Sequence, residues 1–365
     1  MKVCFISNRI FKYGIYDGYG MLTYQIAKGL VERGIEVFVV MQRLLGQPAF
    51  EKIEGIKVYS FPLGKYNLWK SQLLFKKIDA DIYHSQEPSL RTFLAQRAMP
   101  HRKHIITFQD PQTLKEQKTI AKIEGRRLSL YFYLRNIALD YFIKKAVHNS
   151  DYVAVQTNYI KNKVVKMYGL RNQPDFLPNP VKIPFKTTIQ KDSYPTVCFL
   201  ARWDSVKRPE IFFELAKLNP NIQFIAMGKA HSQHRNKELR KRYENIKNLT
   251  LTGFVPEQEK VKVLSKSWIL VNTSKRECLP ISFLEACAHK CAILSYNNPD
   301  NFAGNFGYHV KGNSLEELNE GLRMLLEGNK WRVLGENGFE YVAKNHSFDK
   351  VIEKHIKIYR EICQS

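Results

Sequence analysis

The first 41 residues decide the fold. An apolar run, MKVCFIS (residues 1–7), is followed after a glycine-containing loop by MLTYQIAKGLVER (21–33) and by a second apolar run, IEVFVVM (35–41). In 21–33 the apolar side chains recur every three to four positions, which predicts a helix with one buried face. Gly34 ends that helix, because glycine tolerates the backbone angles found there. The order strand, helix, strand is typical of the opening of a doubly wound, mostly parallel α/β sheet.

A proline-rich stretch, LPNPVKIP (177–184), interrupts this alternation. Proline continues neither a helix nor a central strand, so the stretch predicts a linker. A chain of 365 residues also exceeds the roughly 250–300 residues that one hydrophobic core supports. We therefore expect two α/β domains, over 1–182 and 183–346, and a last amphipathic helix within 347–365. Further strands are predicted at 56–61, 81–84, 104–107 and 152–156 in the first domain, and at 196–200, 222–228, 249–252, 269–272 and 292–295 in the second.

The composition is that of a folded globular protein, with 44% apolar and 12% aromatic residues. No apolar run reaches the roughly 18–20 residues of a membrane span, and the first residues do not form a signal peptide. These features predict a cytoplasmic protein. Its 57 Lys and Arg exceed its 34 Asp and Glu by 23, which predicts an anionic partner: a nucleotide, a nucleic acid or an acidic membrane surface.

Two groups of residues superficially resemble metal sites. Cys287, His289 and Cys291 match no zinc pattern, because no second pair of ligands follows them. Asp79 and Asp81 form an Asp-x-Asp motif that leads into a strand of the first domain, away from the segments described next. We therefore expect no metal site, and we expect the cysteines to be reduced thiols.

The segment SKRECLPISFLEACA (274–288) carries two carboxylates, Glu277 and Glu285, around a predicted helix start at Pro280. A helix N-terminus presents unpaired N–H groups and a partial positive charge, which suit a phosphate. A carboxylate accepts hydrogen bonds only, and can therefore bind two neighbouring sugar hydroxyls. The segment would suit a nucleotide sugar. It is also compatible with an ordinary strand, loop and helix that carry incidental charges.

A second segment, LARWDSVKRPE (200–210), places Arg202 and Lys207 in the loop after the first strand of the second domain. In a doubly wound sheet a diphosphate lies at such a loop. A guanidinium fork and a mobile ammonium could together neutralise a pyrophosphate without a metal. The alternative is a basic loop that is simply solvated.

Together these segments resemble glycosyltransferase family 4, whose members are retaining enzymes of the GT-B fold, with two Rossmann-like doubly wound domains that face each other across a cleft. The resemblance extends over nearly the whole chain. The last helix resembles the one that crosses back to the first domain. The other matching positions are Gly18 and Gly20 before the first helix, Asp81–His84 in a strand, Leu177–Val181 before the linker, and Gly253 after a strand of the second domain.

The resemblance implies that the second domain binds a nucleotide-diphosphate sugar and that no metal or other cofactor takes part. Arg202 and Lys207 would stabilise the diphosphate leaving group, and Glu277 would bind hydroxyls of the sugar. The acceptor, a glycan, a lipid-linked molecule or another hydroxyl, would bind to the first domain. Further donor contacts would come from Glu285 at the ribose, from Leu279, Pro280 and Ile281 at the phosphates, from Gly253 near the base, and from Gly18, Gly20 and Gln109 near the sugar.

Two single positions depart from the family pattern, in addition to the family's double glycine, which Tyr19 interrupts between Gly18 and Gly20. Gln109 stands where the family often has a histidine, and its amide forms hydrogen bonds but does not titrate near neutral pH. Pro280 stands where the family often has a glycine, and it has no N–H to offer a phosphate. These departures leave open a proton-relay role at the first position and the sugar preference.

Other functions are compatible with parts of the sequence. A nucleotide-sugar epimerase or another GT-B enzyme would share the donor-binding segments, although no pyridoxal lysine of a phosphorylase is recognisable. The positive charge could serve a nucleic-acid-directed transferase or a nucleic-acid binder. No zinc finger, helix-turn-helix or aromatic RNA-binding signature is present, so no nucleic-acid partner is expected.

Basic and large apolar residues alternate in two parts of the first domain. The first part contains the large apolar residues Trp69 and Leu73 together with Lys70, Lys76 and Lys77. The second part, residues 115–145, contains eight Lys or Arg. This mixture is typical of an interfacial helix on anionic lipid, and it predicts a peripheral contact with the inner face of a membrane. Lysine-rich solvated helix faces would give the same pattern.

Overall fold

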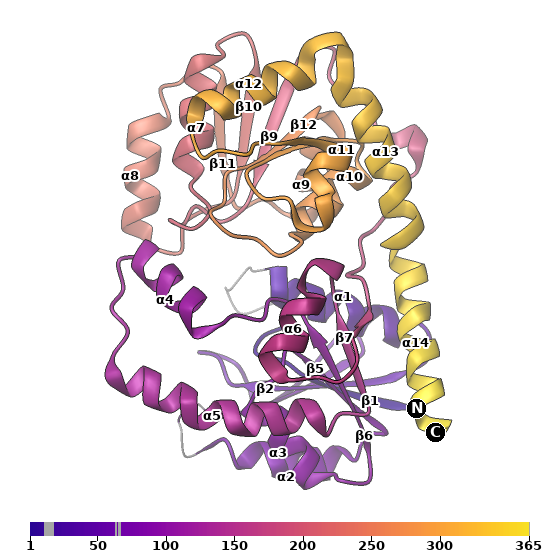
Figure 1. Cartoon of the computed structure of the whole chain (residues 1–365). Helices are drawn as coiled ribbons and strands as arrows, with labels where there is room; N and C mark the ends of the chain where they lie inside the picture. Colours follow the sequence, from indigo (N-terminus) through magenta and orange to yellow (C-terminus); the bar gives the residue numbers. More distant parts are fainter. Residues whose placement is uncertain (11–17, 63, 65–66, 365) are drawn as a thin grey trace. The chain divides into compact units, whose positions relative to one another are not determined.

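The computed structural model describes residues 1–10, 18–62, 64 and 67–364. Its contacts divide the chain into two compact units. The first unit consists of residues 1–115, 128–180 and 348–365, and the second of 116–127 and 181–347. Each unit is an α/β domain built on one sheet (Figure 1). The predicted fold class is thereby confirmed.

The first sheet has the strand order β3-β4-β2-β1-β5-β6-β7-β8. All neighbouring strands are parallel except β3 and β4, which form an antiparallel hairpin. The chain therefore moves outward from β1 in one direction and from β5 in the other. The strands are β1 (Lys2–Ile6), β2 (Glu36–Gln42), β3 (Phe50–Ile53), β4 (Ile56–Phe61), β5 (Ile82–Gln86), β6 (Lys103–Phe108), β7 (Tyr152–Val155) and β8 (Asp175–Phe176).

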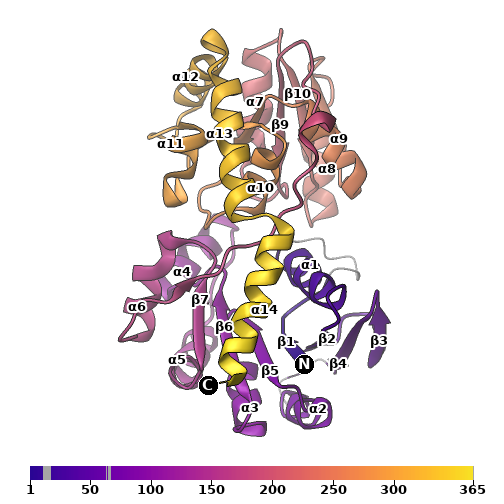
Figure 2. The same ribbon diagram turned by 90° about the vertical axis from the view of Figure 1, so that its right-hand side faces the viewer.

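Helices cover both faces of this sheet, because right-handed crossovers on the two sides of β1 place their helices on opposite faces. On one face α1 (Gly18–Val31) packs against α14 (Phe348–Gln364), the last helix of the chain (Figure 2). On the other face α2 (Lys70–Ile78), α3 (Leu90–Ala98) and α5 (Leu130–His148) contact one another in that order. A shorter helix, α6 (Lys161–Tyr168), follows β7.

The last helix is fixed to the first unit by close packing. A Cβ atom on Gly29 of α1 would lie 2.7 Å from Cγ1 of Ile352, so only glycine lets the two helices approach this closely. Tyr359 of α14 places its hydroxyl 2.7 Å from Nδ1 of His84, which is buried in β5.

The second sheet has the strand order β11-β10-β9-β12-β13-β14, and all neighbouring strands are parallel. Its strands are β9 (Thr196–Leu200), β10 (Gln223–Met227), β11 (Leu249–Gly253), β12 (Ile269–Asn272), β13 (Ala292–Ser295) and β14 (Gly307–His309). The helices are α7 (Pro209–Leu218), α8 (Gln233–Tyr243), α9 (Glu257–Lys266), α10 (Ile281–Ala288), α11 (Phe302–Phe306), α12 (Leu315–Leu326) and α13 (Lys330–Asn345). Most of α4 (Leu114–Ile123) is grouped with this unit.

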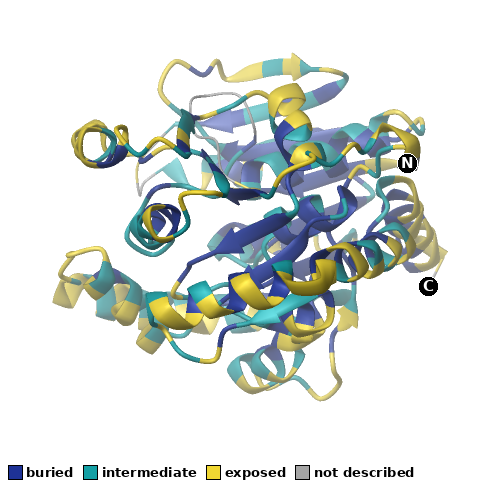
Figure 3. Cartoon of the chain, turned by 90° about the horizontal axis from the view of Figure 1, so that it is seen from above, coloured by how far each residue is buried: buried dark blue, intermediate teal, exposed yellow. Residues whose placement is uncertain are grey.

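Two apolar clusters lie on the two faces of the second sheet. Alternate residues of β9 contribute to each: Val197 and Phe199 belong to one cluster, and Cys198 to the other. This alternation follows from the period of two along a strand. The central strands β9, β12 and β13 are therefore buried on both faces, whereas the helices keep an exposed side (Figure 3). Among the described residues, no helix is long and apolar enough to cross a membrane.

Candidate functional site

The two charged loops predicted from the sequence follow neighbouring strands of the second sheet. β9 and β12 pair in parallel, so both carboxyl ends lie at the same edge. The strand order reverses between them, because β10 and β11 extend to one side and β13 and β14 to the other. Ligands of doubly wound sheets bind at such a reversal, outside the carboxyl ends of the strands. The topology therefore places the loops 201–208 and 273–280 side by side where a ligand is expected.

The loop after β9 is folded around the carboxylate of Asp204. Its Oδ1 accepts hydrogen bonds from the backbone N–H groups of Val206 and Lys207, at 3.1 and 3.0 Å. Its Oδ2 lies 3.1 Å from Nη2 of Arg202, whose Nη1 lies 2.7 Å from Nε2 of His231. Asp204 thereby contacts Arg202 and Lys207, the two predicted cations of the loop, although the sequence alone does not predict a role for it.

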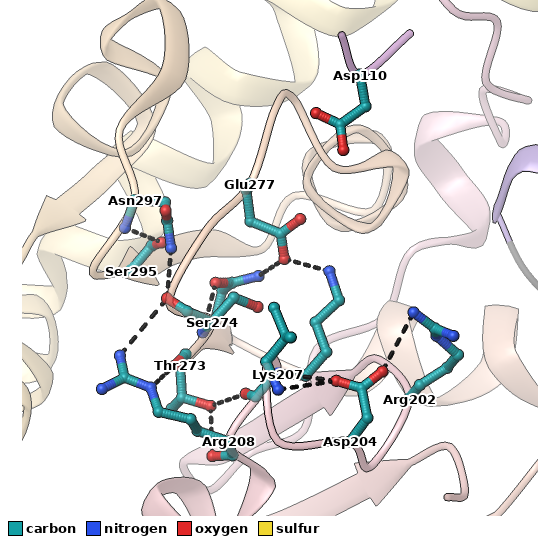
Figure 4. A network of polar contacts seen from close by, with 12 residues as sticks. Asp110, Arg202, Asp204, Lys207, Arg208, Thr273, Ser274, Glu277, Ser295 and Asn297 are labelled. Carbon is teal, nitrogen blue, oxygen red and sulfur yellow. Dashed lines mark hydrogen bonds and ion pairs between the residues drawn. The ribbon is translucent and has the colours of Figure 1, made fainter. Parts of the chain in front are cut away.

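Lys207 meets Glu277 across the two loops (Figure 4). Its Nζ lies 2.6 Å from Glu277 Oε1, which also accepts a hydrogen bond from Nδ2 of Asn272 at 3.2 Å. The Glu277 side chain is only 9% exposed. Both of these contacts use Oε1, so within the described part of the chain Oε2 remains available to a hydroxyl. Two of the predicted catalytic residues are thus in contact, and the third is joined to them through Asp204.

Two further residues, without a predicted role, lock these loops together. The hydroxyl of buried Thr273 lies 2.7 and 2.8 Å from the carbonyl oxygens of Lys207 and Arg208. In return, Nε of Arg208 donates to the carbonyl of Thr273 at 2.6 Å, while its guanidinium stacks on Tyr296 at 4.8 Å from the ring centroid. These contacts fix the backbone that carries Lys207.

Gly228, directly after β10, lets a third loop approach the loop after β9. Its φ of 130° is a conformation that side-chain-bearing residues rarely adopt. A Cβ atom there would lie 1.9 Å from the carbonyl oxygen of Ala201. The N–H of Gly228 donates to the carbonyl of Gly253 at 2.7 Å. Gly253 itself ends β11 with a φ of 79°, so both glycines shape this edge of the sheet.

Helix α10 begins at Ile281, directly after the second loop. Pro280 occupies the N-cap with extended backbone angles, and the N–H of Phe283 donates to its carbonyl at 3.0 Å. The side chain of Leu279 is buried in the core. The first N–H groups of a helix have no partner inside the helix. The N–H of Ile281 is one of these groups, at the N-terminus of α10.

Glu285 lies in α10, and a different lysine holds it. Its Oε1 is 2.5 Å from Nζ of Lys260 on α9, and this lysine also pairs with Glu257 at 2.7 Å. Burial raises the pKa of Glu285 above its usual range, and Lys260 opposes this effect. Glu285 thus forms an ion pair with Lys260. This pair is separate from the ion pair of Lys207 and Glu277.

The predicted residues of the first unit lie on two of its elements. Gly18 is the first residue of α1, and Gly20 is buried two positions later. Gln109 directly follows β6, and its side chain belongs to a buried chain of amides. Its Nε2 donates to Oε1 of Gln86, and its Oε1 accepts from Nδ2 of Asn179, both at 3.0 Å. Because Gln109 is only 5% exposed, it forms part of a packed polar layer at the carboxyl edge of the sheet.

A titratable group not found from the sequence lies beside Gln109. Oε2 of Glu87 accepts hydrogen bonds from the backbone N–H groups of Gln109 and Asp110, at 2.7 and 2.9 Å. Burial raises the pKa of Glu87 to about 7, with Asp110 adding to the increase and the two N–H donors and Lys163 opposing it. Glu87 thus has a pKa near neutral pH, and it lies beside Gln109, which stands where the family often has a histidine.

Glu87→Gln should change how stability depends on pH. Because the folded state raises this pKa, Glu87 stabilises the fold most below its ordinary pKa of about 4.3, and this contribution falls as the pH rises to about 7. The variant should therefore gain stability relative to the natural chain between these pH values, by up to about 1.4 kcal/mol per pH unit. Urea unfolding at a series of pH values measures this difference. Glu353→Gln, a change at an exposed residue of α14, should leave the slope unchanged.

Among the described residues, no group of three or more His, Cys, Asp or Glu side chains is arranged to hold a metal ion. Cys287 and Cys291 are both fully buried. The Sγ of Cys291 lies 3.4 Å from Nζ of Lys191 and 3.2 Å from the carbonyl oxygen of Ser267. These cysteines therefore have contacts inside the core.

The sequence matches two families, one for each half of the chain. Residues 16–183 match the family described as Glycosyltransferase Family 4, and residues 182–341 match the family described as Glycosyl transferases group 1. Among curated proteins, the uncharacterized glycosyltransferase MJ1069 of Methanocaldococcus jannaschii is 26% identical over 341 residues, which cover 86% of this chain and 83% of the relative. A second protein of that organism, the uncharacterized glycosyltransferase MJ1178, is 25% identical over 228 residues, which cover 61% of this chain and 63% of the relative.

Solved structures share the whole fold at low sequence identity. The Anabaena protein HepE, solved in complex with UDP-glucose, superposes with a TM-score of 0.72 at 15% identity and covers 99% of this chain and 100% of its own. WaaG, a glycosyltransferase involved in lipopolysaccharide biosynthesis, gives a TM-score of 0.68 at 16% identity over 98% of this chain and 99% of its own. With both halves matched in order and two parallel-sheet domains in place, the chain belongs to the family 4 type of glycosyltransferases, which have the GT-B fold.

Proposed function

We propose that this glycosyltransferase transfers a sugar from a nucleotide-diphosphate sugar to an acceptor hydroxyl, with retention of the anomeric configuration and without a metal ion. The main support for this proposal is that the loops after β9 and β12 contact each other. There Lys207 lies 2.6 Å from Glu277, and Asp204 contacts both Lys207 and Arg202. Two cations and one carboxylate with an available oxygen are the groups that a sugar diphosphate would require.

The chemistry follows from the charges that develop during transfer. The bond between the anomeric carbon and a diphosphate oxygen breaks, and the acceptor oxygen bonds to the same carbon. The acceptor proton passes to the departing diphosphate. Negative charge grows on the leaving group, and Arg202 and Lys207 stabilise it. Fixed donors of this kind lower the barrier most when they need little rearrangement, and the Asp204 and Thr273 contacts fix the backbone that carries Lys207.

The ion pair of Lys207 and Glu277 would neutralise both charges before the donor binds. Both side chains are largely buried, so each charge needs a partner before the donor binds. A diphosphate would compete with Glu277 for Lys207. Glu277 would then present its oxygens to sugar hydroxyls, and Glu285 would receive those of the ribose.

We propose that the acceptor binds to the first unit and is a glycan, a lipid-linked molecule or another hydroxyl compound. We also propose that the enzyme acts in the cytoplasm, at the inner face of a membrane. All six cysteines are free thiols, which fits a reducing compartment.

Thermal unfolding with a panel of nucleoside diphosphates tests the donor site. A nucleoside diphosphate at about 100 times its dissociation constant should stabilise the protein by about 2.7 kcal/mol, and one base should exceed the others. Inorganic pyrophosphate should stabilise less but measurably. If neither shifts the unfolding temperature at millimolar concentration, the proposed donor site is wrong.

Glu285→Gln should separate ribose binding from phosphate binding. The variant should bind the nucleoside diphosphate about 10- to 100-fold more weakly, because hydrogen bonds to a charged group contribute roughly 1.5–3 kcal/mol. Its affinity for pyrophosphate should not change. Calorimetric titration measures both constants. Glu257→Gln is the matched control, because Glu257 shares Lys260 but is 48% exposed. Equal losses for both ligands would contradict the ribose role.

A further inference from the structure

Helix α5 of the first unit leaves most of its surface without a protein partner. Of its 19 residues only Ala146 and Val147 are buried, and both lie in its last turn. That end is fixed to α3 by Phe142, whose ring centroid is 5.1 Å from that of Phe93. Gln96 of α3 also donates to the carbonyl of Ala146 at 2.8 Å. The first three turns lie along the outside of the helical layer (Figures 1 and 2).

The exposed side of α5 carries an apolar stripe. Its members follow one another by four, three and four positions, which places them on one helix face. They are far more exposed than is usual for such side chains: Leu130 is 74% exposed, Leu134 59%, Ile137 63% and Tyr141 65%. Contiguous apolar surface of this kind marks a binding site for a protein or a membrane. In the same layer, Trp69 at the N-cap of α2 and Leu73 within α2 are 55% and 56% exposed.

The charge around the stripe identifies the partner. Together α2, α3 and α5 carry eight Lys or Arg and a single acidic residue, Asp140, which pairs with Lys144 at 2.8 Å. Of the eight, only Arg91 is buried. Arg135 and Lys145 of α5 are exposed. A second copy of this chain would place like charges against one another, which is unfavourable. An anionic lipid surface accepts both the apolar side chains and the cations.

We propose that the outer surface of α2 and α5 docks on an anionic membrane. In this arrangement α5 lies in the headgroup region with Leu130, Leu134, Ile137 and Tyr141 toward the acyl chains. Lysines and arginines of α2 and α5 contact lipid phosphates. The proposal extends the proposed function, because it names the surface through which the enzyme would reach a lipid-linked acceptor. It does not require the transfer reaction to take place.

Co-sedimentation of the full chain with vesicles tests the proposal. The protein should bind vesicles of phosphatidylcholine that contain about 30% phosphatidylglycerol, which give the bilayer a negative surface potential. Binding should fall at least tenfold with pure phosphatidylcholine, and it should weaken as salt rises. Leu134→Glu with Ile137→Glu should reduce binding at least tenfold while the unfolding temperature stays unchanged, because both side chains are exposed.

Two comparisons make the outcome decisive. Leu218→Glu changes a leucine that is 50% exposed on α7 of the second unit, and it should leave vesicle binding intact. Arg135→Gln with Lys145→Gln keeps the apolar stripe and should reduce the salt dependence.

Equal binding by the Leu134/Ile137 double variant and the natural chain would overturn the proposal. So would light scattering that shows a dimer which this double variant dissociates, because the stripe would then belong to a second copy. Nucleoside diphosphate binding should be the same in all variants, so failure here is distinguishable from failure of the donor site.

Discussion

Lys207→Ala should lower the rate of sugar transfer about 100- to 1000-fold, measured with the donor whose nucleoside diphosphate gives the largest thermal stabilisation. Loss of one fixed group that stabilises developing negative charge costs this much in other enzymes. The position of Lys207 is well defined, because Thr273 holds its carbonyl, Asp204 holds its N–H, and its Nζ lies 2.6 Å from Glu277 Oε1. Nucleoside diphosphate affinity should also fall. The larger loss should be in turnover, because charge on the leaving group peaks during transfer.

The variant also leaves Glu277 without its cation, so its fold needs a separate check. Thermal unfolding without ligand shows whether the protein remains folded at the assay temperature, and Lys207→Arg keeps the charge and should retain part of the activity. Lys247→Ala removes the same charge from an exposed position of the second unit and should transfer sugar at the natural rate. Turnover of Lys207→Ala within a few-fold of the natural rate would contradict the assignment.

Gly228→Ala should destabilise the protein by about 2–6 kcal/mol. The change adds roughly 1–3 kcal/mol of backbone strain at a φ of 130° and roughly 1–3 kcal/mol of overpacking. The new Cβ would lie 1.9 Å from the carbonyl oxygen of Ala201, a backbone atom that yields only if the loop after β9 moves. Because that loop carries Arg202 and Lys207, donor affinity should decrease as well. Urea unfolding and calorimetric titration measure the two effects.

Gly328→Ala is the matched control for this substitution. Gly328 also has a positive φ, of 58°, and a Cβ there would have no neighbour within 4 Å. This variant should therefore lose only about 1–2 kcal/mol, the cost of a left-handed backbone conformation, and should keep its affinity for the donor. If both glycine variants lost the same stability, the close approach of Gly228 to Ala201 would not be what makes glycine necessary at this position.

The sequence predicts the long central strands well and the short peripheral ones poorly. Central parallel strands are buried on both faces, so they read as continuous apolar runs, and β4 spans the predicted residues 56–61. Three short strands, β3, β8 and β14, are not predicted. The turn between β3 and β4 contains Glu54, with a φ of 45°, before Gly55. Asn-Gly or Asp-Gly is the usual signal for such a hairpin turn, and glutamate gives none.

The candidate site is predictable where residue type alone indicates chemistry. Arg202, Lys207 and Glu277 carry charges next to predicted strand ends, and the structure brings the loops that hold them together. Asp204 and Thr273 bind backbone atoms, so only the folded loop reveals them. Lys260 pairs with Glu285 from a position 25 residues away in another helix, and no local pattern indicates that contact. The burial of Glu87, which raises its pKa, likewise comes from tertiary packing.

A crystal structure of the protein with a bound nucleoside diphosphate would show whether the loops after β9 and β12 form the donor site. We expect the diphosphate at the carboxyl ends of β9 and β12, with Lys207 Nζ and the Arg202 guanidinium about 2.7–2.9 Å from its oxygens. Glu285 should lie within hydrogen-bonding distance of the ribose hydroxyls. A ligand bound elsewhere, or one whose phosphates contact neither Arg202 nor Lys207, would contradict this assignment.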